Sequence, residues 1–110
     1  MTDNVFLLVL VTCPDEPCAS GLARHVVDSG HAACVNVLPM VRSIYAWKGA
    51  VESADEVLLL IKTTADRFES LRAALVAKHP YEVPEVVALT IADGHHPYLD
   101  WLADPRTQAS

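Results

Sequence analysis

The stretch Val5–Val11 (VFLLVLV) decides the fold of this 110-residue chain. It is continuously apolar and rich in branched side chains, a pattern typical of a central β-strand covered on both faces. Pro14 ends the strand, and Asp15 then supplies a helix N-cap with Pro17 in the first turn. The apolar residues that follow recur at helical spacing and predict one buried face: Ala19, Leu22, Ala23, Val26 and Val27. Gly30 is the predicted helix stop.

The middle of the chain predicts a long hairpin. A second strand is expected over Ala32–Leu38, and Pro39 interrupts it, as at a sheet edge or a bulge. Alternating residues resume over Met40–Lys48, Gly49 marks a turn, and Val51–Thr63 is the third strand. The two long strands around the turn are expected to extend beyond the rest of the sheet.

The last third predicts a helix, a strand and a short helix. Thr64 is a suitable N-cap for a helix that buries one apolar side, comprising Phe68, Leu71, Leu75 and Val76. Pro80 ends it, and Glu85–Ala92 is the fourth strand. Pro97 opens a terminal helix that contains Leu99 and Leu102. Residues 106–110 are polar and are expected to fray.

The resulting order, β-α-β-β-α-β plus a short helix, is an α+β, ferredoxin-like split βαβ arrangement in a single domain, 1–110. Its two main helices cover one face of an antiparallel sheet. Yet 52% of the residues are hydrophobic, more than so small a domain can hide in one core. We therefore expect the uncovered sheet face to be buried between subunits.

Charge and cysteine content exclude several classes of protein. The net charge is −6 and the 8 Lys and Arg residues are scattered, so no basic stripe exists to bind nucleic acid. The apolar runs are far shorter than the roughly 20 residues needed to span a bilayer. Met1–Asn4 lacks the basic start of a secretory signal. An odd number of cysteines, 3, fits reduced thiols, and we expect a cytoplasmic protein without a membrane partner.

The segment His79–Glu85 (HPYEVPE) is the densest group of residues capable of chemistry. Its prolines fix the backbone, and His79, Glu82 and Glu85 are the residue types that bind a divalent metal. The alternative is that Tyr81 and the prolines form a packed turn and the glutamates are solvated.

Cysteine and histidine elsewhere leave alternatives open. Cys34 is either an inert strand residue or a thiolate ligand for copper. Cys13 and Cys18 lie five apart, a poor match to metal or redox motifs, although Cys13 before a helix N-terminus could have a lowered pKa. The adjacent pair His95-His96 is interpreted as surface histidine.

Tyr45 and Trp47 share one face of their strand near the hairpin turn. They either pack across strands or subunits, or they form the wall of a small-molecule pocket with Lys62 as a partner for an anion. Lys62 follows an apolar strand, so pairing with Glu52, Glu56 or Glu82 is a further expectation.

Several blocks of sequence together resemble the CutA family of divalent-cation tolerance proteins. They include Ala32–Pro39 (AACVNVLP), Ser43–Gly49 (SIYAWKG), Glu56–Thr63 (EVLLLIKT) and His79–Glu85. The resemblance runs from about Val9 to Leu102. Met40 departs from it, since the family commonly has glycine there.

The resemblance implies a cytoplasmic homotrimer that is similar in assembly to PII signalling proteins and linked to tolerance of divalent metals, especially copper. It also implies a crevice between subunits lined by shared polar residues. The matching positions are Cys34, Tyr45, Trp47, Lys62, His79, Tyr81, Glu82 and Glu85.

Three functions follow as hypotheses. The first is a non-enzymatic trimer that binds Cu(II) or another divalent cation through Cys34, His79 and Glu82 or Glu85, without an organic cofactor. The second is a PII-like sensor or scaffold that binds a small anion or a partner protein through Lys62, Tyr45 and Trp47. An enzyme that uses Glu82 or His79 as a general base ranks last, because no catalytic motif accompanies these residues.

Overall fold

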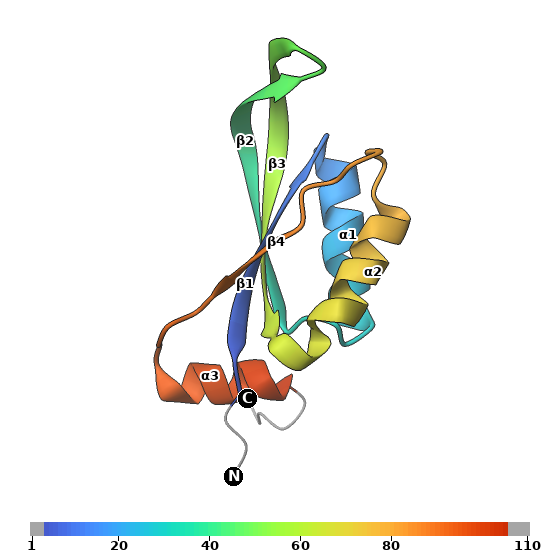
Figure 1. The fold of residues 1–110 in the computed structure, drawn as a ribbon. Coiled ribbons are helices and arrows are strands. Elements are labelled where there is room, and N and C mark those ends of the chain that lie inside the picture. The colour runs from blue at the N-terminus through green and yellow to red at the C-terminus, as the bar shows by residue number, and fades with distance from the viewer. Residues whose placement is uncertain (1–3, 106–110) are drawn as a thin grey trace.

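The computed structural model describes residues 4–105 as a four-stranded sheet with two helices against it and a third at one end (Figure 1). The elements are β1 (Phe6–Cys13), α1 (Glu16–Asp28), β2 (Cys34–Trp47), β3 (Ala50–Thr64), a 3₁₀ turn (Ala65–Arg67), α2 (Phe68–Lys78), β4 (Val87–Thr90) and α3 (His96–Ala103). The strand order is β2-β3-β1-β4, and each neighbouring pair is antiparallel. The predicted ferredoxin-like arrangement is confirmed, whereas the tail expected to fray lies outside the described residues.

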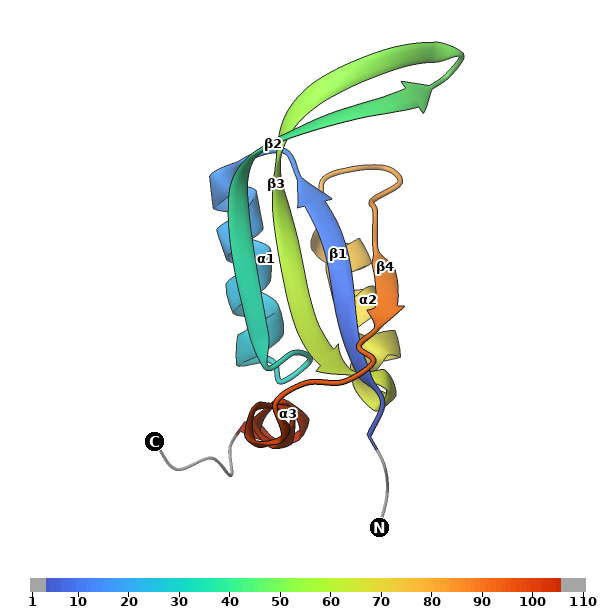
Figure 2. The same ribbon diagram turned by 90° about the vertical axis from the view of Figure 1, so that its left-hand side faces the viewer.

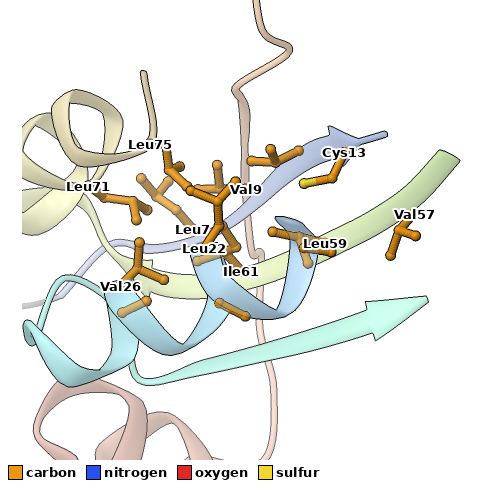
Figure 3. Close-up of a cluster of buried hydrophobic side chains, with 14 residues drawn as sticks. Leu7, Val9, Cys13, Leu22, Val26, Val57, Leu59, Ile61, Leu71 and Leu75 are labelled. Atoms are coloured by element: carbon orange, nitrogen blue, oxygen red, sulfur yellow. The ribbon is translucent and has the colours of Figure 1, made fainter. Parts of the chain in front are cut away.

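Helices α1 and α2 cover one face of the sheet and build the main core with it (Figure 3). Asp15 caps α1 as predicted, since its carboxylate accepts a hydrogen bond from the Cys18 amide at 2.9 Å. Among the side chains with 0% exposure are Val9, Val11, Val26, Leu59, Ile61, Leu71 and Leu75. Alternate residues of the two central strands therefore all point into the helix-covered layer.

Two apolar helix residues predicted to be buried are not. Val27 is 41% exposed and Val76 is 49% exposed. Each directly follows a fully buried residue, Val26 or Leu75. Because successive helical positions are rotated by about 100°, these side chains lie on the flanks of their helices and miss the sheet.

The opposite face of the sheet is apolar and mostly uncovered. The strand register brings Leu8, Leu10, Leu58, Leu60 and Leu89 together there, and Leu89 is 48% exposed. Figure 2 views this face, with α3 in front of the sheet at one end and α1 and α2 behind it. We call it the open face.

Helix α3 covers only the end of the open face. Leu99 and Leu102 pack there with Ala33 and the partly buried Phe6. The Arg67 guanidinium fastens the helix by donating hydrogen bonds to the carbonyls of Leu102 at 3.3 Å and Ala103 at 2.5 Å. These bonds satisfy carbonyls that have no partner within the last turn of a helix.

The hairpin of β2 and β3 projects beyond the rest of the sheet, as predicted (Figure 1). Its register is interrupted between Leu38 and Val41, so Pro39 does mark a bulge on an edge strand. Met40 has a φ of +65° there. Before the bulge Val37 pairs with Leu59, and after it Tyr45 pairs with Glu52. The extra residue thus moves the odd-numbered side chains of β2 from the helix-covered side to the other side.

Two predicted boundaries are wrong. The fourth strand is limited to Val87–Thr90, because it pairs only with the part of β1 from Leu7 to Leu10. Thr64 makes no side-chain capping bond, and α2 begins only after the 3₁₀ turn. Thr64 is 2% exposed, so its side chain is held in the interior instead of at a helix end.

Candidate functional site

A cleft of about 550 Å³ lies between the hairpin and the loop that follows α2. Its walls come from three segments that are distant in sequence: the end of β1, the hairpin and the loop. The lining residues are Thr12, Ser43, Ile44, Tyr45, Trp47, Glu52, Glu56, Tyr81, Glu82, Val83 and Glu85. The bulge in β2 contributes directly, because it places Tyr45 on the same side as Glu52 and Glu56.

His79 anchors the loop to the sheet. Its side chain is buried, and its Nε2 lies 2.8 Å from the carbonyl oxygen of Thr12. The amide of Tyr81 donates to Nδ1 at 3.1 Å, so Nδ1 accepts and Nε2 carries the hydrogen. Both ring nitrogens are therefore engaged, and neither offers a lone pair to a metal in this conformation.

Tyr81 joins the loop to the floor of the cleft. Its hydroxyl donates to the carboxylate of Glu56 at 2.6 Å, and Glu56 is 8% exposed. Burial raises the pKa of Tyr81 well above its usual range, and the hydrogen bond and charge of Glu56 raise it further. The phenol therefore keeps its proton, and the short bond holds the Glu56 carboxylate in place.

The cleft unites most of the predicted site residues: Tyr45, Trp47, Tyr81, Glu82 and Glu85. It also contains Glu52 and Glu56, which the sequence suggested only as partners of Lys62. The sequence does contain a signal that Glu52 belongs to the cleft. If the hairpin turns at Gly49, pairing the residues of the two strands outward from the turn places Glu52 opposite Tyr45.

Cys34 and Lys62 lie away from the cleft. They are opposite one another in the β2–β3 register, near α3, where the Lys62 ammonium lies 5.7 Å from the centre of the Tyr98 ring. The suggested pairing of Lys62 with Glu52, Glu56 or Glu82 is therefore not formed. Within one subunit, Cys34 is not brought together with His79.

A metal does not fit the proposed ligand set within one subunit. In residues 4–105, no group of three or more His, Cys, Asp or Glu residues is arranged to hold a metal ion. The described residues do not bring Cys34 together with Glu82 and Glu85 in such a group, and ligation by this set stays a prediction. His95 precedes the first turn of α3 and His96 is exposed, consistent with surface histidines.

Cys13 and Cys18 lie in the helix-covered layer. Cys13 is fully buried and Cys18 packs against the same core cluster (Figure 3 labels Cys13). Burial, followed by the neighbouring Cys18, raises the pKa of Cys13 to about 12, so the predicted lowering is wrong. Loss of hydration of the thiolate outweighs the nearby helix N-terminus.

Comparisons with known proteins identify the family of this chain. Residues 7–105 match the family model described as CutA1 divalent ion tolerance protein. The chain belongs to the CutA1 family. A divalent-cation tolerance protein CutA of Thermus thermophilus is 48% identical over 97 residues, which cover 88% of this chain and 94% of that protein. Human protein CutA is 48% identical over 92 residues, but this chain spans only 51% of its length.

Solved CutA1 structures share the fold. Cut A1 from Thermus thermophilus has a TM-score of 0.88 at 47% identity, covering 90% of this chain and 96% of that one. CutA1 from Oryza sativa also has a TM-score of 0.88, at 39% identity, with 96% of each chain covered. None of the helices within residues 4–105 has the length and apolar character needed to cross a membrane.

Proposed function

We propose that this CutA1-family chain is a non-enzymatic, cytoplasmic homotrimer that confers tolerance to divalent cations by binding a metal such as Cu(II) between its subunits. The observation that carries this proposal is the open face. Its leucines continue the core pattern of the same strands, but α3 covers only one end of this face, so a second sheet is the natural cover. The unpaired thiols of Cys13, Cys18 and Cys34 support a reducing location.

Carboxylates support the choice of a cation. Glu82 and Glu85 line the cleft and are the acidic loop residues that a neighbouring subunit could complete with Cys34. Oxygen ligands suit divalent cations in general, and the added thiolate favours copper. Because both His79 nitrogens are engaged, we assign His79 to positioning the loop.

Calorimetric titration of the metal-free protein with Cu(II) tests the metal site. Replacing both Glu82 and Glu85 with Gln should weaken binding about tenfold or more, as should Cys34→Ser. Asp66→Asn, which removes a charge from an exposed position outside the cleft, is the matched control. A dissociation constant unchanged in both the Glu82/Glu85 and Cys34 variants would refute this ligand set.

A further inference from the structure

The lining of the cleft is acidic, and one positive group, the ammonium of Lys48, lies beside its Trp47 wall. Glu52, Glu56, Glu82 and Glu85 line it, and no lysine or arginine does. Among residues 4–105 the ion pairs are Arg42–Asp55 and Arg72–Glu69, which involve none of these four carboxylates. The cleft is therefore complementary to a ligand with positive charge.

Three aromatic side chains form part of the remaining wall, together with Thr12, Ser43, Ile44 and Val83. Tyr45 and Trp47 lie on the same side of β2 and are 40% and 41% exposed, and Tyr81 lies on the loop across from them. The ammonium of Lys48 is already 5.7 Å from the centre of the Trp47 ring. This distance is within the range at which an aromatic ring attracts a cationic amine.

Glu56 gives the cleft a fixed anionic floor. Tyr81 occupies one of its two oxygens at 2.6 Å, and the side chain is almost completely buried. A buried carboxylate gains more from a nearby ammonium than an exposed one, because less water screens the pair. The most favourable place for a positive group is therefore beside Glu56.

The volume points to an organic ligand. At about 550 Å³ the cleft falls within the range of pockets that bind small organic molecules, and it is far larger than a bare ion needs. Aromatic rings suit methylene groups, and carboxylates suit the ammonium groups between them. We propose that the cleft binds an aliphatic polyamine, with one ammonium near Glu56 and its methylene chain along Tyr45 and Trp47.

Titration with spermidine in the presence of a metal chelator tests this binding. Glu56→Gln keeps an acceptor for Tyr81 but removes the charge, and Trp47→Leu removes the ring from a partly exposed site. Each change should weaken spermidine binding about fivefold or more. Asp66→Asn should leave it unchanged, and Lys48→Gln should leave it equal or stronger because a competing ammonium is gone.

Three results would overturn the proposal: no spermidine binding at millimolar concentration, equal weakening by Asp66→Asn, or full affinity in both cleft variants. Circular dichroism of each variant confirms that it is folded. The proposed polyamine site and the proposed metal site use carboxylates of the same cleft. They differ in chemistry, because a polyamine binds through ammonium groups and needs no metal. Spermidine binding under chelator without Cu(II) binding would refute the proposed function alone, and the reverse pattern would refute this inference alone.

Discussion

The two faces of the sheet carry the same kinds of side chain but differ in what covers them. Leu59 points into the layer under α1 and α2 and is fully buried, whereas its neighbour Leu60 points to the open face and is only partly covered. Both are leucines on one strand, one residue apart. The chain thus completes one apolar layer by itself and leaves an equivalent layer unfinished, which a monomer in water would not favour.

The largest expected effect separates these two leucines. Leu59→Ala should lower the free energy of unfolding by about 2–5 kcal/mol at every protein concentration, because it leaves a cavity in the closed layer. Leu60→Ala should lower the free energy of unfolding of the isolated subunit by less. The loss that it causes should also depend on protein concentration. Urea denaturation at two concentrations measures both. If both variants lost the same free energy of unfolding at both protein concentrations, the two faces of the sheet would not differ in the way described.

The second effect concerns assembly. Leu60→Lys places a charge in the middle of the open face, and burying that charge between sheets is strongly unfavourable. The variant should sediment as a smaller species than the parent at micromolar concentration. Ala77→Lys, on the exposed side of α2, is the control and should sediment like the parent. A parent protein that is already monomeric would refute the trimer.

A third effect uses a titratable group in the closed layer. The raised pKa of Cys13, about 12 against a usual 9.0, means that the folded protein holds this proton more tightly than the unfolded chain does. Its stabilising contribution is therefore complete below pH 9 and is lost as the pH rises toward 12, at up to about 1.4 kcal/mol per pH unit.

The comparison of variants isolates this thiol from other groups that titrate at high pH. Cys13→Val should lose less stability between pH 9 and 12 than the parent does. Cys34→Val, on the open face, should lose as much as the parent. Denaturation curves at several pH values provide the measurement, and identical pH profiles for all three proteins would contradict the assignment.

The smallest effect belongs to the bulge that separates the regular part of β2 from the hairpin. Met40 has a positive φ and is 93% exposed, so its side chain makes few contacts in exchange for the strain. Met40→Gly should raise the free energy of unfolding by about 0.5–1 kcal/mol. A small rise in Tm would be the readout, and a fall would show that the Met40 side chain is buried in the assembled protein.

Most of the fold follows from local patterns in the sequence. The apolar run in β1, the spacing of Ala19, Leu22 and Val26, and the turn at Gly49 each have one simple structural solution. The errors occur where neighbours decide the outcome. Val27 and Val76 have the right spacing but do not face the sheet, and β4 pairs with β1 only over Val87–Thr90, a part of the predicted strand.

The site was harder to predict than the fold, because it depends on register and on distant pairings. The motif at His79–Glu85 was found, but its histidine proves to be a hydrogen-bonded anchor to Thr12. The sequence does not predict that Glu56 forms part of the cleft. Nothing in its own segment indicates that Tyr81, 25 positions later, donates a hydrogen bond to its carboxylate. Contacts of this kind are fixed by tertiary packing and leave no periodic signal in the sequence.

The bulge at Pro39 and Met40 divides β2 into two halves under separate constraints. Side chains before it are fixed by the packing of the core, whereas Tyr45 and Trp47 after it face the cleft. One inserted residue thus frees the hairpin to vary without disturbing the interior of the subunit. Substitutions in the hairpin can therefore change the cleft while the core stays as it is, and deleting one residue of the bulge would turn Tyr45 and Trp47 to the opposite face of the strand.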